Sequence, residues 1–430
     1  MITLYPRVVC AERTTTLTLT DERGRQMNGT AIVTVQSMEK YNVPHTGAYR
    51  IDEQDRFRGF EVVFTDGRAQ FDFTFSGEQR HRVFCRIGEE TSVFEVYSLK
   101  PDLYALNPYK GDTHIHSTAS DGLNTPDAVA EAYYAAGFDY IALTDHHVYR
   151  ESAKLSEKIA SVMRDFYAYP GEEVHNRGMG YFHIINFGAK KSVNELINAD
   201  PDRLFAEVTQ NRSGIAKKYG LPEGLDPSEF AFRLWVSEKI RESGGVSVLC
   251  HPYWDAFDEY NMQTDMLEFL LKQGIFDAFE VCDDNDRTGN GCNLQTAMYE
   301  ELRAAGYRIP VVGASDCHNV GSELFGKFFT YAFCEKVSGV KEAVKDFHTV
   351  AVERIGSEFR VHGPFRLVKY TRFLVDQFEP GYAGIKAQSA TQLFDAVNQK
   401  DLEMVHKIEN EVAAYRNLFF GKAPCGVARA

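Results

Sequence analysis

Residues 111–116 read Gly-Asp-Thr-His-Ile-His, and residues 140–147 read Tyr-Ile-Ala-Leu-Thr-Asp-His-His. In the first stretch His114 and His116 stand two positions apart, and alternate residues of a strand point to the same face. Both imidazoles can therefore reach one metal ion. In the second stretch an apolar run that is typical of a buried strand ends directly in Asp145 and His146. Both stretches predict strands that end in metal-ligating side chains.

The sequence around these stretches alternates helix and strand signals. Thr125-Pro126-Asp127 supplies a helix N-cap, a proline at the first helical position and an acid in the first turn, and the helix predicted over residues 128–136 ends at Gly137. Buried strands are predicted at residues 140–143, 166–169, 246–249, 276–281 and 309–312. This alternation favours a parallel α/β array, either open or closed.

Most of these strands end in a side chain that can bind a metal ion. The donors that follow His114 and His116 are Asp121, His146, Glu172 or Glu173, His183, His251, Asp316 and His318. Active sites of α/β proteins collect at the carboxyl ends of parallel strands, so we expect these side chains to converge. Nitrogen and oxygen donors without thiolates suit Mn²⁺, Zn²⁺ or Fe²⁺, and about nine donors are too many for one tetrahedral ion. Two or three divalent metal ions are therefore expected.

Each donor taken singly also has a plainer interpretation. His183 lies in an apolar run and could be a hydrogen-bonded core residue, while His251-Pro252 could be only a turn. His147 and His175 have no partner that fixes a role, so they are either supporting or surface residues. Several motifs in one consistent strand-end setting nevertheless favour a metal site over coincidence.

The ordered motifs resemble the PHP (polymerase and histidinol phosphatase) family of metal-dependent phosphoesterases. The matching motifs are His114-Ile-His116, Ser120-Asp121-Gly122, Thr144-Asp145-His146, Gly171-Glu172-Glu173, His251-Pro252 and Asp316-Cys317-His318. The resemblance covers residues 110 to 335 and implies a distorted seven-stranded (βα) barrel with a di- or trinuclear site at its C-terminal mouth.

The resemblance also implies a set of metal ligands. His114, His116 and Asp316 would hold one ion, and Glu173 would bridge it to a second ion held by His183 and His251. A third ion would be held by Asp121, His146 and His318. Glu173 is favoured over the adjacent Glu172 as the bridging residue on spacing alone.

Besides Glu173, three residues are candidates for a catalytic role: Asp145, Arg177 and Arg287. Asp145 could orient the imidazole of His146 or carry a proton. A cationic side chain near the third ion would neutralise phosphoryl oxygens, and Arg177, Arg287 and Lys327 come from the motif loops. For each of these cations, an ordinary surface charge is the plainer interpretation.

The N-terminal region has a different pattern. Residues 14–20 and 70–75 alternate polar with apolar residues, and turn signals such as Asn28-Gly29 and Asp66-Gly67 separate the runs. We expect a β-sandwich domain over residues 1–107, the barrel over 108–336 with a helical insertion at about 190–245, and a mostly helical C-terminal region over 337–430. A β-rich domain that leads into the His-x-His motif also resembles the CehA/McbA-like metallohydrolase branch of this superfamily.

Composition narrows the classes of partner. The chain has 430 residues and a net charge of −14, which opposes attraction to long nucleic acid or to an anionic membrane. No apolar run approaches the roughly 20 residues of a membrane span, and the N-terminus lacks a secretory signal pattern, so the cytoplasm is the expected location. The eight cysteines form no CxxC pair and suit reduced, buried thiols. Oligomeric state is left open.

These observations predict a metal-dependent hydrolase that cleaves the phosphate ester of a small molecule or nucleotide with a metal-bridging hydroxide. The alternative is a carboxylic or carbamate ester hydrolase that uses the same metals. A third hypothesis is a binding module on a degenerate barrel. It is disfavoured because no motif position has been replaced by an apolar residue.

Overall fold

The computed structural model describes residues 2–22, 27–39, 59–175, 182–256, 258–282, 291–322 and 325–422. Its backbone contacts divide the chain into two compact units. Unit 1 comprises residues 1–106, 372–382 and 410–430, and unit 2 comprises residues 107–371 and 383–409. The predicted domain bounds stay a prediction.

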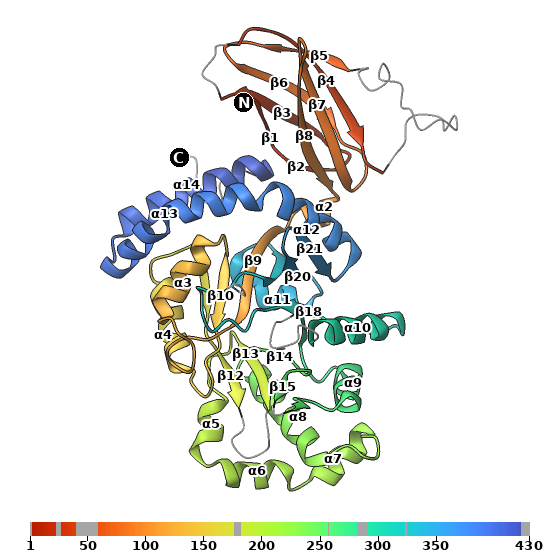
Figure 1. Ribbon diagram of the computed structural model, residues 1–430, viewed down its shortest axis with the longest axis vertical. Helices are drawn as coiled ribbons and strands as arrows, with labels where there is room; N and C mark the ends of the chain where they lie inside the picture. The colour runs from red at the N-terminus through yellow and green to blue at the C-terminus, as the bar shows by residue number, and fades with distance from the viewer. Residues whose placement is uncertain are drawn as a thin grey trace. The chain divides into compact units, whose positions relative to one another are not determined.

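Unit 1 is rich in antiparallel strands (Figure 1). Its strands are β1 (Ile2–Tyr5), β2 (Val8–Cys10), β3 (Thr14–Asp21), β4 (Gly29–Ser37), β5 (Phe60–Phe64), β6 (Arg68–Thr74), β7 (Gln79–Ile87) and β8 (Glu90–Leu99). Among the described residues they form one sheet in the order β1-β3-β6 and another in the order β2-β8-β7-β4-β5. Leu17 and Phe71 from the first sheet pack in one apolar cluster with Val33 and Val83 from the second. The predicted period-2 strands are present, and the sandwich form stays a prediction.

Unit 2 is mixed α/β, as predicted, and its strands form two main sheets in the described residues. The first has the order β11-β10-β9-β19-β20-β21 and the second the order β12-β13-β14-β17-β18. Their bounds are β9 (Asn107–Ile115), β10 (Tyr140–Leu143), β11 (Tyr167–Tyr169), β12 (Gly171–His175), β13 (His183–Phe187), β14 (Val246–Leu249), β17 (Ala278–Cys282), β18 (Val311–Gly313), β19 (Phe328–Cys334), β20 (Thr349–Ile355) and β21 (Glu358–His362).

The expectation of an all-parallel array is wrong. Strands β9, β10 and β11 are parallel, as are β14, β17 and β18. In contrast, β13 is antiparallel to both neighbours, and β19 is antiparallel to β9 and β20. Isolated bridges join the sheets at Ile115–Cys317 and His146–Glu173, which are residues of the predicted site or their neighbours. A closed seven-stranded barrel stays a prediction.

The described helices belong partly to unit 1 and partly to unit 2. They are α2 (Pro101–Tyr104), α3 (Pro126–Ala135), α4 (Arg150–Ala160), α5 (Asn194–Ala199), α6 (Pro201–Thr209), α7 (Arg212–Tyr219), α8 (Pro227–Glu242), α9 (Thr264–Gln273), α10 (Gly291–Ala304), η1 (Val337–Gly339), α11 (Val340–Lys345), α12 (Phe365–Gln377), α13 (Glu379–Gln399) and α14 (Leu402–Phe420), with a small hairpin of β15 (Asp255–Ala256) and β16 (Glu259–Tyr260). Helix α3 begins as predicted, because Thr125 Oγ1 accepts a hydrogen bond from Ala128 N. Helices α5 to α8 form the helical segment predicted near residues 190–245 and lie together in Figure 1. No described helix combines the length and hydropathy that a membrane crossing requires.

Gly111 allows β9 and β10 to approach closely. It pairs with Tyr140, and a Cβ at Gly111 would overlap the fully buried Tyr140 ring. We expect Gly111→Ala to lower the free energy of unfolding by about 1–3 kcal/mol through overpacking. Gly384→Ala is the matched control, because Gly384 is exposed within α13 and has nothing within 4 Å of the added Cβ. This change is expected to stabilise the helix by about 0.5–1 kcal/mol. Chemical denaturation measures both, and equal effects would contradict the packing argument.

Candidate metal centre

The strand ends of unit 2 position the site. His116 directly follows β9, and His146 lies just after β10. His251 and Asp316 lie shortly after the ends of β14 and β18, and both have left-handed backbone conformations, with φ of 25° and 48°. Such conformations are costly for residues other than glycine, and they concentrate at functional sites. The chain turns sharply at these two positions, which lets the side chains converge.

Glu173 lies at the middle of the cluster and is fully buried. Its Oε1 atom is 2.8 Å from His183 Nδ1 and 3.1 Å from His251 Nε2. Its other oxygen, Oε2, is 3.3 Å from His114 Nε2, 3.2 Å from His116 Nε2 and 3.1 Å from His146 Nδ1. The two oxygens of one carboxylate therefore face two different groups of imidazoles.

Asp316 completes the first of these groups. Its Oδ1 atom is 2.7 Å from His116 Nε2 and 3.1 Å from His114 Nε2. Donor atoms of His114, His116, Glu173 and Asp316 all lie within 4.8 Å of one another, as do those of Glu173, His183 and His251. Each group is compact enough for one cation.

The remaining ligands predicted from the motifs lie nearer to solvent. Asp121 Oδ1 is 3.4 Å from His318 Nε2, and Asp121 Oδ2 is 3.7 Å from His146 Nε2. The Asp121 side chain is 55% exposed and that of His318 36% exposed, whereas the ligands around Glu173 and Asp316 are almost completely buried. With His116, these three residues form another group whose donor atoms lie within 4.8 Å of one another. The structure thus brings together all nine residues that were predicted as ligands.

Burial and charge oppose each other in this cluster. Burial alone would raise the pKa of the Glu173 carboxyl, but the imidazoles of His183, His146 and His114 hold it well below its usual value. The same holds for Asp316. Burial would raise the pKa of its carboxyl, but His114 and His116 hold that pKa well below the usual range. Both carboxylates are therefore ionised at neutral pH, as metal ligands must be.

The donor set fits divalent cations. Within the described part of the chain, the buried nitrogens His116 Nε2, His146 Nδ1 and His251 Nδ1 make no hydrogen bond of acceptable geometry. This holds although His116 Nε2 lies only 2.7 Å from Asp316 Oδ1 and His146 Nδ1 only 3.1 Å from Glu173 Oε2. Burial of such atoms is costly unless something binds them. Imidazole nitrogens and carboxylate oxygens are the ligands that Zn²⁺, Mn²⁺ and Fe²⁺ accept, and one cation can satisfy several converging acceptors at once.

The two neighbouring glutamates have different environments. Glu173 was expected at the end of the third strand, but β11 ends at Tyr169 and Glu173 lies inside the following strand, β12. Alternation along β12 turns the adjacent Glu172 away from the cluster. The Glu172 carboxylate accepts hydrogen bonds from Asn186 Nδ2, Ser192 Oγ and the backbone N–H of Val193, at 2.6–2.8 Å. Glu172 therefore anchors the segment that leads into α5.

Asp145 is buried, and its carboxylate accepts hydrogen bonds from the loop that follows β9. It accepts hydrogen bonds from the backbone N–H and the Oγ of Ser117, at 2.7 and 2.8 Å, and from Ser120 Oγ at 2.8 Å. These contacts hold the loop that carries Asp121. A positioning role for Asp145 thus has direct geometric support, although its partner is the loop rather than the expected imidazole of His146.

Of the three predicted cationic residues, Lys327 alone lies among the described residues. Arg177 and Arg287 lie outside the described residues, so their catalytic role stays a prediction. Lys327 has its Nζ 5.0 Å from the centre of the Phe328 ring.

Two buried acids near the ligands were missed by the sequence analysis. Glu280 on β17 is 1% exposed, and its Oε2 is 3.0 Å from His114 Nδ1. A carboxylate on the outer nitrogen fixes the tautomer of a ligating imidazole and raises its basicity. The available signal was an acidic residue inside the apolar run Ala278-Phe-Glu-Val-Cys.

The second missed acid is Asp112, two residues before His114. Its carboxylate accepts hydrogen bonds from Tyr133 Oη at 2.9 Å and from Ser315 Oγ at 2.5 Å. Burial raises the pKa of Asp112 to about 6, against the opposing effect of these hydrogen bonds. Because Ser315 precedes Asp316, Asp112 connects β9 to the loop that presents that ligand.

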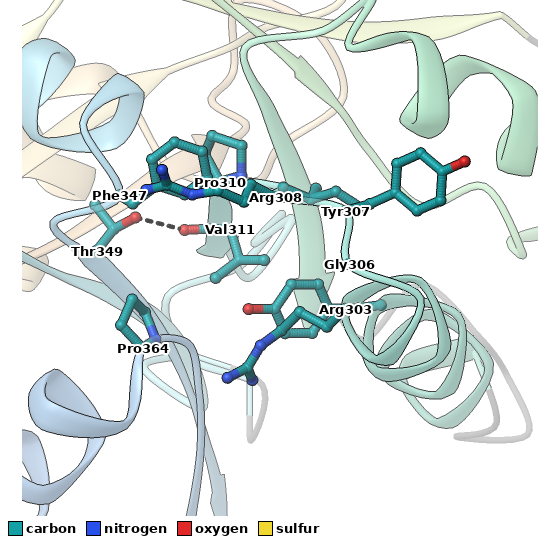
Figure 2. A pocket seen from close by; sticks show the side chains of 11 residues that line it. Arg303, Gly306, Tyr307, Arg308, Pro310, Val311, Phe347, Thr349 and Pro364 are labelled. Carbon is teal, nitrogen blue, oxygen red and sulfur yellow. Dashed lines mark hydrogen bonds between the residues drawn. The ribbon is translucent and has the colours of Figure 1, made fainter.

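A separate cavity of about 320 Å³ lies at the other end of β18 (Figure 2). Arg303, Arg308 and Phe347 contribute to its lining, and Thr349 Oγ1 donates to Val311 O at 2.8 Å beside it. Val311 is the first residue of β18, whereas Asp316 follows its last residue. The cavity therefore does not belong to the metal centre.

No family model matches the chain. A stretch of 67 residues, 16% of the chain, is 42% identical to the DNA polymerase/3′-5′ exonuclease PolX of Bacillus subtilis and spans 12% of that protein.

Solved structures with a similar fold include a two-domain protein from Bacteroides vulgatus that contains a predicted PHP-like metal-dependent phosphoesterase. It is 20% identical, with a TM-score of 0.38 and coverage of 57% of this chain and 65% of that chain. An amidohydrolase from Chromobacterium violaceum with bound sulfate and no metal is 19% identical, with a TM-score of 0.33 and coverage of 49% and 88%. The likeness to the CehA/McbA-like branch stays a prediction.

Proposed function

We propose that this chain is a metal-dependent hydrolase and that its substrate is the phosphate ester of a small molecule or nucleotide. The observation that carries the proposal is the position of Glu173, whose two oxygens face separate groups of imidazoles at 2.8–3.3 Å. A carboxylate in this position would be shared by two cations, one in each group of imidazoles. Paired cations of this kind activate water and polarise the scissile ester when they are bound.

The residues of the chain have distinct tasks in this proposal. His114, His116 and Asp316 would hold one cation, and His183 and His251 would hold the second, with Glu173 contributing to both groups. Asp145 keeps the Asp121 loop in place through Ser117 and Ser120. Glu280 fixes the orientation of His114.

The exposed third group supports a phosphate ester as the substrate. Asp121, His146 and His318 lie nearest to solvent, with side-chain exposures of 55%, 20% and 36%. A cation held there would meet an incoming substrate first and would neutralise the charge of phosphoryl oxygens. A neutral carboxylic or carbamate ester has no such charge to neutralise, so it is the less favoured substrate of the same centre.

Three aryl substrates test the proposal. Protein stripped with a chelator and then reloaded with Mn²⁺ is assayed with p-nitrophenyl phosphate, bis(p-nitrophenyl) phosphate and p-nitrophenyl acetate. We expect Mn²⁺-dependent turnover of at least one phosphate ester and a weaker metal response with the acetate. Metal-dependent turnover of the acetate alone would replace the proposed substrate by a carboxylic ester. No metal-dependent turnover of any substrate would contradict the hydrolase itself.

A further inference from the structure

Two histidines outside the predicted ligand set lie against it. His175 is the last residue of β12 and pairs directly with His183, the first residue of β13. The ring centroids of His175 and His183 are 4.4 Å apart, and those of His175 and His146 are 5.4 Å apart. His147 also lies next to His175, with ring centroids 4.4 Å apart. His175 and His147 thus extend the group of imidazoles beyond the predicted ligands His146 and His183.

The geometry of three of these residues is that of a cation site. One donor nitrogen from each of His146, His175 and His183 lies within 4.8 Å of the others. His175 Nδ1 is buried and makes no hydrogen bond with any described residue. A buried nitrogen without a partner, beside two more donor nitrogens, has the arrangement that an ion would complete.

We propose that His146, His175 and His183 form an additional, all-nitrogen cation site that takes Zn²⁺ present in excess and thereby inhibits the enzyme. Inhibition rests on the proposed function, whereas the extra binding site does not. The site has imidazole donors only, and such a set suits Zn²⁺, Cu²⁺ or Ni²⁺, whereas Mn²⁺ and Mg²⁺ prefer carboxylate and water oxygens. We therefore expect the additional site to bind Zn²⁺ but not Mn²⁺, whereas the groups that contain a carboxylate accept both metals.

Inhibition follows from shared residues. His146 Nδ1 is 3.1 Å from Glu173 Oε2, and His183 Nδ1 is 2.8 Å from Glu173 Oε1. An imidazole that turns to bind Zn²⁺ beside His175 must weaken its hold on a cation next to Glu173. Excess Zn²⁺ is thus expected to disturb both cation groups that Glu173 connects, while excess Mn²⁺ is not.

Zinc counting tests the site without any assay of activity. The full chain is titrated with Zn²⁺ alone by isothermal titration calorimetry, and the bound zinc is counted by elemental analysis. His175→Ala and the more conservative His175→Gln are compared with His348→Ala, which removes an exposed histidine outside the cluster. We expect both His175 variants to lose about one equivalent of zinc, or at least about tenfold in affinity for the last equivalent, while His348→Ala matches the wild type.

A second readout connects the site to inhibition. With the Mn²⁺-loaded protein and p-nitrophenyl phosphate, the Zn²⁺ concentration that halves the rate is expected to rise at least about tenfold in His175→Gln relative to His348→Ala. Unchanged zinc stoichiometry and affinity in both His175 variants would overturn the proposal. Loss of the zinc equivalent in a protein without phosphatase activity would uphold the binding site and contradict only the proposed function.

Discussion

Replacing Glu173 by glutamine is expected to abolish hydrolysis and to lower the affinity for divalent cations, while the fold is retained. The amide keeps one acceptor oxygen, so it can face His183 and His251 or the group around His114, but not both. Losing one bridged cation removes a contribution of several kcal/mol to transition-state stabilisation, which corresponds to at least about 10³-fold in kcat/KM. Elemental analysis and steady-state kinetics measure the two effects.

Glu172→Gln is the matched control for this variant. The two glutamates are adjacent, fully buried and on the same strand, but Glu172 accepts hydrogen bonds from Ser192 and Asn186 instead of facing imidazoles. An amide NH₂ placed against these donors is expected to cost about 1–3 kcal/mol of unfolding free energy with the metal content retained. If Glu173→Gln binds metal and turns over like the wild type, or if Glu172→Gln loses the metal instead, Glu173 is not the bridging residue.

Glu280→Gln is expected to lower the affinity for Mn²⁺ by about 10–100-fold, because the outer nitrogen of His114 loses its carboxylate. The contact is short, at 3.0 Å between Glu280 Oε2 and His114 Nδ1, and both residues are buried. The amide still fills the space, so the variant tests the charge and the hydrogen bond rather than the packing. Competition with a coloured chelator gives the dissociation constant directly.

Asp277→Asn is the control for Glu280. Asp277 precedes the same strand, but its carboxylate binds Arg241 Nε and Ser247, away from the cluster. The Asp277→Asn variant is expected to have a lower free energy of unfolding and the same Mn²⁺ affinity as the wild type. Equal Mn²⁺ affinity in Glu280→Gln and the wild type would contradict the role of Glu280 in orienting His114. It would leave the proposed metal ligands unaffected.

The residues that converge in the cluster could be found in the sequence because strand ends are locally encoded. His114 and His116 alternate in the sequence, and His146 and Asp316 come directly after apolar runs of recognisable strand type. The choice between Glu172 and Glu173 had weaker support, since it depends on β12 being a separate strand paired antiparallel with β13. A shift of one residue exchanges the two faces of a strand.

Other features could not be predicted, because they depend on contacts distant in sequence. The antiparallel direction of β19 is set by its pairing with β9 and β20, which the apolar run of residues 328–334 does not encode. Strand β20 lies in the region that was expected to be mostly helical, and it is held in its sheet by pairing with β19. In the sequence, Glu280 is an isolated acid in an apolar strand. Its role depends on contact with His114, which lies 166 residues earlier in the chain.

Anomalous diffraction from a Mn²⁺-loaded crystal, recorded at the manganese edge, tests the central claim most directly. The account predicts two or three peaks about 3.5–4 Å apart, with the Glu173 carboxylate between two of them and imidazole nitrogens of His114, His116, His183 and His251 as ligands. The absence of peaks around Glu173, or a single peak elsewhere in the chain, would contradict it.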